Sequence, residues 1–200
     1  LIDGTSSKND KLLRNDYDNN LGHPYFTDVT REAGILIEGF GLGISVSDIN
    51  KDGWKDVFVS NDYLTNDLLW INNKDGTFTD RASEYFKHTS YSSMGNNIVD
   101  FNNDGNNEII ELDMMPDDNY RRKTMLTENN YNTYINNERY KYDFQYVRNT
   151  LQLNQGFMDG NPIYSEVSMF SGVSGTDWSW APIVGDYNND GFNDLIITNG

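Results

Sequence analysis

The chain of 200 residues contains no cysteine and only two histidines. Without cysteine it can form neither disulfide bonds nor thiolate metal sites. Basic residues are also scarce, since 15 lysines and arginines stand against 31 aspartates and glutamates, for a formal net charge of −16 at pH 7. Such a composition argues against binding to nucleic acid or to an anionic membrane surface, because there is no basic patch to bind phosphates. No run approaches the roughly 18 apolar residues of a membrane-spanning helix.

The apolar residues that are present favour strands over helices. Apolar residues make up 36% of the chain, and 13 tyrosines and 10 phenylalanines supply much of that share. Aromatic side chains are enriched in strands, whereas helical bundles are rich in leucine. A folded domain with so much negative charge must either spread it over the surface or bind cations that offset it.

Two sequence motifs each occur three times, and the copies of both motifs are separated by the same numbers of residues. The first is an acidic loop between short strands: GISVSDINKDGWKDVFVSND from Gly43, MGNNIVDFNNDGNNEIIELD from Met94 and WAPIVGDYNNDGFNDLIITNG from Trp180. Their first loop aspartates are Asp48, Asp100 and Asp186, which are 52 and then 86 residues apart. The second motif, as in DLLWINNKDGTFTDRASEYF, repeats the same separations at its aromatic markers, which are Phe26, Phe78 and Tyr164. Two unrelated motifs in one register indicate three copies of one structural unit.

The second unit is longer than the first because it contains an insertion of about 34 residues, placed roughly between Asp113 and Arg148. Near its start, Asp117 and Asp118 precede RRKTML, which predicts a short helix, whereas the later asparagine-rich stretches predict loop. Insertions in repeat proteins usually lie on one face, often the binding face.

Each unit reads as strand, acidic loop, strand, turn, strand, glycine-containing turn and strand. Four strands in about 50 residues are typical of a propeller blade. We therefore predict an all-β fold in which residues 1–200 form one repeat region of about three four-stranded blade equivalents. Closed propellers have about 4–8 blades, so the chain is expected to be part of a larger propeller. A missing segment or another chain would supply the remainder, and an open stack of small sheets is the alternative.

The acidic loops place oxygen-bearing side chains at positions 1, 3, 5 and 9 and glycine at position 6. Position 7 can offer its main-chain carbonyl whatever its side chain. Counting positions 1, 3, 5, 7 and 9 in each loop, the predicted metal ligands are Asp48, Asn50, Asp52, Trp54 and Asp56, then Asp100, Asn102, Asp104, Asn106 and Glu108, then Asp186, Asn188, Asp190, Phe192 and Asp194.

Calcium fits this pattern because it takes six to eight hard oxygen ligands in a flexible cage. Glycine at position 6 permits the sharp bend. Zinc and copper are disfavoured by the absence of histidine and cysteine from the loops, and magnesium by its preference for water. Clusters of aspartate, asparagine and glycine also form ordinary turns between strands, but a turn does not require an acid at both position 1 and position 9 of every copy. An EF-hand would need an acid at position 12, which only the second loop has, as Glu111. The prediction is about three calcium ions.

The chain resembles the FG-GAP/VCBS repeat family, the calcium-loop propeller repeats also seen in integrin α subunits. The resemblance is carried by PYFTDVTREAGI, GFGLGISVSDINKDGWKDVFVSND, DGTFTD and TDWSWAPIVGDYNNDGFNDLIITNG. The resemblance is greatest to bacterial surface proteins in which such repeats precede an ASPIC/UnbV domain. It implies a β-propeller, calcium ligands in the loops, and a place outside the cell or on the bacterial outer surface, with or without a lipid anchor. Glu108 in place of aspartate and the enlarged second unit depart from the family pattern.

Three functions remain open from the sequence. The first is a calcium-stabilised surface scaffold that binds a protein or glycan. The second is a catalytic propeller, such as a polysaccharide lyase that uses calcium to neutralise a uronate, with a base drawn from the insertion. The third is a structural spacer in a large surface protein. The sequence identifies no catalytic residue and no organic cofactor, which favours a binding role over an enzyme.

Overall fold

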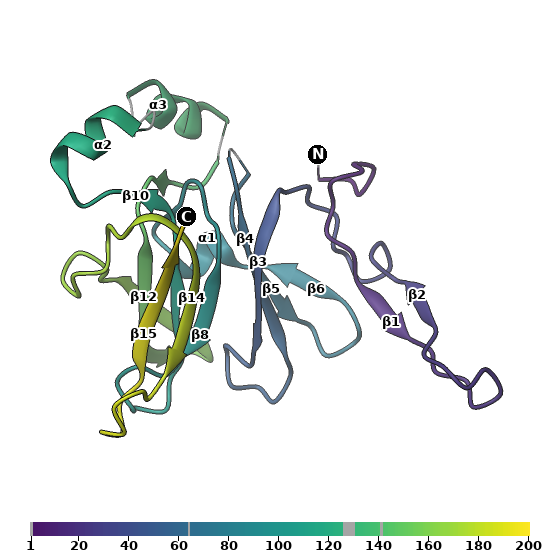
Figure 1. Cartoon of the computed structure of the whole chain (residues 1–200). Coiled ribbons are helices and arrows are strands. Elements are labelled where there is room, and N and C mark those ends of the chain that lie inside the picture. The colour runs from purple at the N-terminus through teal and green to yellow at the C-terminus, as the bar shows by residue number, and fades with distance from the viewer. Residues whose placement is uncertain (1, 64, 126–130, 141) are drawn as a thin grey trace.

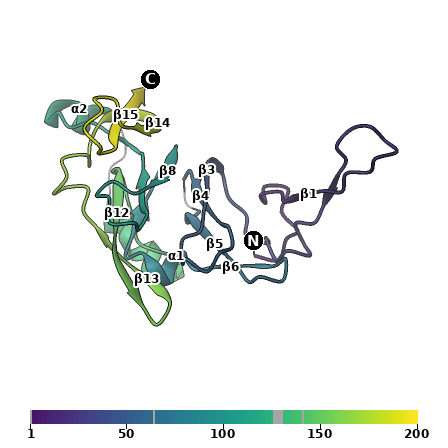
Figure 2. The same ribbon diagram turned by 90° about the horizontal axis from the view of Figure 1, so that it is seen from below.

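The computed structural model describes residues 2–63, 65–125, 131–140 and 142–200. Short antiparallel sheets follow one another in chain order, from purple to yellow in Figure 1. Figure 2 shows the same sheets fanned out side by side. The predicted all-β fold of propeller-like blades is confirmed.

The first complete blade is a four-stranded sheet with the strand order β3-β4-β5-β6. Its strands are β3 (Gly41–Ser47), β4 (Asp56–Asn61), β5 (Leu68–Asn72) and β6 (Phe78–Asp80). Register pairs such as Val46 with Val57 and Val57 with Trp70 align the strands. A turn with Gly76 at φ 90° closes the β5–β6 hairpin, as the glycine in the motif predicts.

The second blade repeats this plan across the insertion, with the order β13-β12-β9-β8. Its strands are β8 (Asn96–Val99), β9 (Glu108–Glu111), β12 (Thr150–Met158) and β13 (Asn161–Glu166). The two ends of the chain add partial blades: β1 (Leu13–Asn15) pairs with β2 (Phe26–Asp28), and β14 (Asp177–Gly185) pairs with β15 (Asp194–Asn199). All three copies of both motifs therefore take equivalent places, the first in inner strands and the second in outer strands.

The insertion carries two helices and two short bridging strands. Helix α2 (Asn119–Met125) follows Asp118, whose Oδ1 accepts the Arg121 backbone N–H at 2.9 Å, so the predicted short helix is confirmed as far as residue 125. Leu126, the last residue of that predicted segment, lies outside the described residues. The expectation of loop in the asparagine-rich stretch was wrong, because α3 (Tyr131–Tyr140) forms there.

Short elements join the insertion to both neighbouring blades. Strand β10 (Met114–Met115) pairs with β14, and β11 (Gln145–Tyr146) pairs in parallel with β7 (Thr89–Ser90), which follows helix α1 (Ala82–Tyr85). In the described parts of the chain, no helix combines the length and apolar character needed to cross a membrane.

The first blade is apolar on both faces because a blade packs against a neighbour on each side. Phe58 and Leu69 face the second blade, in a core with Ile109. Val59 and Trp70 face the opposite way, in a core with segments that precede β3. The continuous apolar runs in β4 and β5 thus reflect burial on two sides.

The inner strands β3, β8 and β14 lie side by side, and small residues allow their close approach. Gly43, Gly95 and Ala181 occupy the same place, five residues before the first loop aspartate. A Cβ added to Gly43 would lie 2.7 Å from the Met94 carbonyl oxygen, and one added to Gly95 would lie 2.5 Å from the Trp180 carbonyl oxygen. The obstructing atoms are main chain and cannot swing away, so the spacing between blades depends on these residues.

Gly95→Ala is expected to destabilise the protein by about 1–3 kcal/mol, because overpacking against main chain forces the blades apart. At about 2–4 °C per kcal/mol, the melting temperature should fall by about 2–12 °C. Gly185→Ala is the matched control, since its added Cβ would make an ordinary contact of 3.5 Å with Tyr187. Thermal melts followed by circular dichroism check this, and equal melting temperatures for the two variants would contradict it.

Candidate metal-binding loops

The three acidic loops connect β3 to β4, β8 to β9 and β14 to β15, and they lie together at the lower end of the strands in Figure 1. Each loop joins the inner strand of a blade to its neighbour. All fifteen residues predicted as ligands fall in these connections or at the first residue of the strand that follows.

The aspartate at position 1 organises its loop through backbone N–H groups. Asp48 Oδ1 accepts the Asp52 N–H and Oδ2 accepts the Gly53 N–H, both at 2.9 Å. Asp100 accepts the corresponding bonds at 3.2 and 2.8 Å, and Asp186 at 3.1 and 2.9 Å. These carboxylates therefore fold the chain back on itself in every copy.

The side chains at positions 3 and 5 continue the same pattern. In the first loop, Asn50 Oδ1 accepts the Asp52 N–H at 3.1 Å and Asn50 Nδ2 donates to Asp52 Oδ2 at 2.9 Å. Asp52 Oδ1 in turn accepts the Trp54 N–H at 2.9 Å. The second and third loops reproduce all three bonds. The donor atoms are therefore held in one arrangement three times over.

The bend that brings these oxygens together lies at positions 4 and 6. Glycine at position 6 has φ 90° in the first loop, 83° in the second and 92° in the third. Position 4 is also left-handed, with φ 58° at Lys51, 59° at Asn103 and 60° at Asn189. Asparagine tolerates this conformation better than most residues, which accounts for asparagine at position 4 in two of the loops.

The acid at position 9 is the most buried residue of the first two loops and closes them. Asp56 Oδ2 accepts the Ile49 N–H at 2.8 Å, and Oδ1 accepts the Asn72 N–H of the third strand at 2.9 Å. Glu108 Oε2 accepts the Phe101 N–H at 2.8 Å, but Glu108 Oε1 is buried with no hydrogen-bond partner. A buried carboxylate oxygen left without a partner is costly, and a bound cation would satisfy it.

The pKa values of the loop acids shift in opposite directions. The backbone N–H of Asn106 lowers the pKa of Asp104, and that of Phe192 lowers the pKa of Asp190. Burial raises the pKa of Asp56 and of Glu108, in each case together with repulsion from the other acids of the loop. A divalent cation between positions 5 and 9 would relieve both the burial cost and the repulsion.

The donor set fits calcium by its chemistry. Every candidate ligand atom is a hard oxygen, and carboxylates that accept one hydrogen bond per oxygen keep a second lone pair free. Among the residues that the structure describes, no three acidic, histidine or cysteine side chains come close enough together to hold a metal ion by themselves. A cation in a loop would thus need asparagine and position-7 carbonyl oxygens beside the carboxylates. Its role would be electrostatic, holding the acids together.

Glu111, the acid that would complete an EF-hand in the second loop, does not join that loop. It lies at the far end of β9, where Oε1 accepts the Ser60 hydroxyl at 2.9 Å and Oε2 accepts the Ser90 N–H at 3.2 Å. Strands flank the loop instead of helices. The EF-hand alternative is therefore excluded, and the acid at position 9 closes the loop.

Residues 48–110 match the sequence model of the FG-GAP-like repeat, a stretch that runs from the first acidic loop through the second. This part of the chain is therefore similar to the FG-GAP-like repeat, and together with the blades described above it indicates a β-propeller-like module. A comparison with curated proteins finds no match to the chain.

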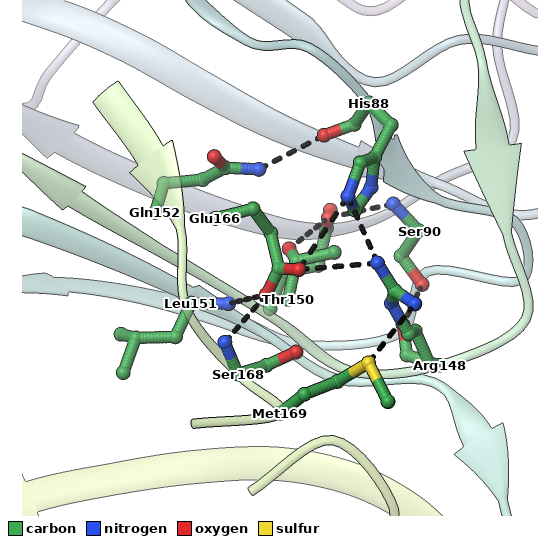
Figure 3. A network of polar contacts seen from close by, with 10 residues as sticks. His88, Ser90, Arg148, Thr150, Leu151, Gln152, Glu166, Ser168 and Met169 are labelled. Carbon is green, nitrogen blue, oxygen red and sulfur yellow. Dashed lines mark hydrogen bonds and ion pairs between the residues drawn. The ribbon is translucent and has the colours of Figure 1, made fainter. Parts of the chain in front are cut away.

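A half-buried polar network around Arg148 was not foreseen from the sequence. Figure 3 shows Arg148 between His88 and Glu166; its Nη2 lies 3.0 Å from His88 Nε2 and 3.1 Å from Glu166 Oε2. Burial opposes ionisation of Glu166, but hydrogen bonds from His88, Ser168 and Leu151 lower its pKa to about 2. The three side chains come from segments far apart in the sequence, so the network becomes visible only when the fold brings them together. The network fastens the end of the insertion to β13.

A second missed cluster consists of the buried acids Asp67, Glu111 and Asp113, at the opposite strand ends from the loops. Asp67 Oδ2 accepts the Ser93 hydroxyl at 3.2 Å, and Asp113 Oδ2 accepts the Ser90 hydroxyl at 2.6 Å. Burial raises the pKa of all three acids, and repulsion from Glu111 raises that of Asp67 further. Burial of this kind is visible only in the structure.

The calcium-free protein is expected to lose stability as pH rises above the ordinary carboxylate range near 4, because these acids bind protons more tightly when folded than when unfolded. The stabilising protonation is complete below about pH 4 and is lost as pH passes the raised pKa values. Between pH 5 and 8 the free energy of unfolding in EDTA should therefore fall as these carboxyls lose their protons.

Asp67→Asn is the matched variant, since its amide carries a permanent donor in place of the carboxyl proton. It should flatten the pH dependence measured by urea unfolding. A wild-type stability that rises between pH 5 and 8 would contradict the assignment.

Proposed function

We propose that this chain is a calcium-binding β-propeller module of the extracellular space or the bacterial outer surface, which serves as a scaffold for binding a protein or glycan. About three calcium ions would bind, one in each acidic loop. The single observation that carries the calcium proposal is the repetition of one loop geometry in three copies, with acids at positions 1, 5 and 9 each time.

Charge and burial support the calcium proposal independently. Three divalent ions would change the formal charge from −16 to −10, which lowers the self-repulsion of the folded chain. The unpartnered Glu108 Oε1 would gain a partner in the second loop. The resemblance to repeats of proteins outside the cell supports the surface location. The same proposal includes an ASPIC/UnbV domain and a lipid anchor in the full-length protein.

The remainder of the propeller would cover an apolar stripe on the inner strand of the first blade. Leu42, Ile44 and Val46 alternate along β3 and are 56%, 69% and 58% exposed. The other face of β3 packs against β8, so a further blade from outside these 200 residues or from another chain would cover the stripe in the same way. Residues 1–200 would then form one continuous repeat region.

The insertion supplies a surface suited to a ligand. Helices α2 and α3 stand at the opposite end of the strands from the loops (Figure 1). Residues 113–148 hold six of the 15 basic residues and six of the 13 tyrosines, and their net charge is zero. Tyr120, Tyr131 and Tyr140 are largely exposed. Tyrosine and arginine are enriched at protein interfaces, which supports binding over a spacer role.

A calcium-dependent lyase would need a base close to a loop, but the insertion that would supply its Lys, Arg or Tyr carries its helices at the opposite end of the strands (Figure 1). Neither histidine is placed at an acidic loop. His88 lies in the Arg148 network, and His23 lies on the connection between β1 and β2, where its Nδ1 is 2.9 Å from the Pro24 carbonyl oxygen. Incubation with a panel of acidic polysaccharides, followed at 235 nm, roughly the absorbance of unsaturated uronates, remains the direct test, and turnover would overturn the scaffold proposal.

Calcium should raise the melting temperature strongly. With the weak affinity of extracellular modules, about 1 mM, calcium at roughly 10 mM would stabilise the protein by about 1.4 kcal/mol per site. Three sites give about 4 kcal/mol, or about 8–16 °C at this chain length. The measurement compares thermal melts in EDTA, in calcium and in magnesium at equal ionic strength.

The matched control is the triple variant Asp52→Ala, Asp104→Ala and Asp190→Ala, which removes the position-5 acid from each loop and should lose the calcium response. Superimposable wild-type melts in EDTA and calcium would overturn the calcium proposal.

Tyr131→Ala combined with Tyr140→Ala should abolish binding to any glycan that the wild-type protein retains on a glycan array, while the calcium-dependent melt stays unchanged. The expected loss is tenfold or more, since an exposed aromatic contact contributes about 1 kcal/mol or more to an interface. Glycan binding that survives both substitutions would place the ligand elsewhere, and an array without any bound glycan would favour a protein ligand or the spacer role.

A further inference from the structure

The three acidic loops are joined to one another by side chains that are not among the proposed metal ligands. Asn103, at position 4 of the second loop, donates from Nδ2 to the carbonyl oxygen of Gly191 in the third loop at 2.7 Å. Asn193, at position 8 of the third loop, donates from Nδ2 to the carbonyl oxygen of Asp100 in the second loop at 2.8 Å. The second and third loops thus hold each other's main chain in both directions.

The first and second loops are joined from the same two positions. Lys51, at position 4 of the first loop, donates from Nζ to Asn106 Oδ1 in the second loop at 2.7 Å. Asn107, at position 8 of the second loop, donates to the Ser47 hydroxyl, next to the first aspartate of the first loop, at 2.9 Å. Position 4 therefore reaches forward to the next loop and position 8 reaches back to the previous one.

The points of contact lie on residues of the proposed coordination shell or next to them, at atoms other than the proposed ligand atoms. Asp100 is the position-1 ligand of its loop, Asn106 is the position-7 ligand, and Gly191 is bonded directly to the position-7 residue Phe192. A cation that orders one loop would therefore also fix the main chain of the neighbouring loop. Part of the ordering cost of the second binding event is then already met, which produces positive cooperativity without a large structural change.

Resting on the proposed calcium function, we propose that adjacent loops bind calcium cooperatively through the side chains at positions 4 and 8. Coupling of this kind changes affinity by about fivefold or more. It is reciprocal, so loss of the cation from the third loop weakens binding at the second as much as the reverse. The row of loops would then respond to calcium as a unit.

The chain supplies its own matched controls. Asn189 occupies position 4 of the third loop with φ 60°, nearly equal to the 59° of Asn103, and Lys55 occupies position 8 of the first loop. Within the described residues, neither side chain makes a hydrogen bond to a neighbouring loop. Asn103→Gly with Asn193→Ala breaks the coupling, whereas Lys55→Ala with Asn189→Gly makes the same kinds of change outside the contacts. Glycine keeps the left-handed backbone at position 4 in both pairs.

The experiment measures calcium binding at the second loop with and without a working third loop. Hydrogen–deuterium exchange of peptides covering residues 100–108 is followed over a calcium titration of the 200-residue chain, and calorimetry gives the total number of ions. Asp190→Ala, which disables the third loop, should raise the half-saturating calcium concentration of the second loop about fivefold or more in the parent and in the control pair. In the Asn103→Gly, Asn193→Ala background the same change should be less than twofold.

An Asp190→Ala effect below twofold in the parent would overturn the coupling while leaving calcium binding intact. So would an unchanged fivefold effect in the Asn103→Gly, Asn193→Ala background. A parent chain that binds no calcium in the calorimeter would overturn both this proposal and the function on which it rests. Thermal melts verify folding, and if the pair of substitutions unfolds the chain, each single substitution is expected to reduce the coupling by itself.

Discussion

The structure depends on how closely the inner strands of successive blades can approach. Where Gly43 meets Gly95, and Gly95 meets Ala181, main chain lies against main chain, and a single Cβ would meet atoms that cannot move. This spacing allows short side chains at the other end of the strands to reach the next loop, as Asn103 reaches Gly191 at 2.7 Å. It also brings Phe58 and Ile109 of adjacent blades into one core. The shared apolar core and the row of joined loops are thus two consequences of the close spacing that the small inner-strand residues allow.

The same packing determines how the chain accommodates its excess of acids. Acids on the surface remain solvated, but Asp56 and Glu108 are buried by the blades at one end of the strands, and Asp67, Glu111 and Asp113 at the other. At the far end, hydroxyls and main-chain N–H groups surround the carboxyls, and burial holds their pKa values high. At the loop end, the open oxygens on acids and asparagines suit a divalent cation instead. The two ends of the first two blades thus accommodate buried acids by different means: hydrogen-bond donors surround the carboxyls at one end and, by our proposal, calcium binds them at the other.

Much of the fold could be predicted from the sequence because repetition made weak local signals strong. The two motifs share one register, and this register alone placed the inner and outer strands correctly. The register is carried by Asp48, Asp100 and Asp186 in the first motif and by Phe26, Phe78 and Tyr164 in the second. The helix α3 was missed because YNTYINNERY has few strong helix formers and forms a helix within a longer insertion. The Arg148 network and the buried acid cluster were missed because their members are far apart in the chain. Nothing local marks His88 as a partner of Arg148, or Asp67 as buried. The ligand assignments of the loops stay predictions, whereas their positions in the fold are now established.

The geometry of the loops also indicates what a cation would contribute. In each copy the position-1 aspartate already accepts two backbone N–H groups, and positions 3 and 5 accept further ones, so hydrogen bonds alone give the loop its shape. A zinc finger differs, because its chain is unfolded without metal. Here the unsatisfied feature is charge: each loop carries three acids, and one of them is buried in the first two loops. A cation would therefore remove the repulsion that opposes this loop shape, and so reduce the motion of a loop that hydrogen bonds have already shaped. Stabilisation of that kind spreads to neighbouring blades only through contacts such as those of Asn103 and Asn193, because screened charge alone falls off within about a Debye length of 10 Å.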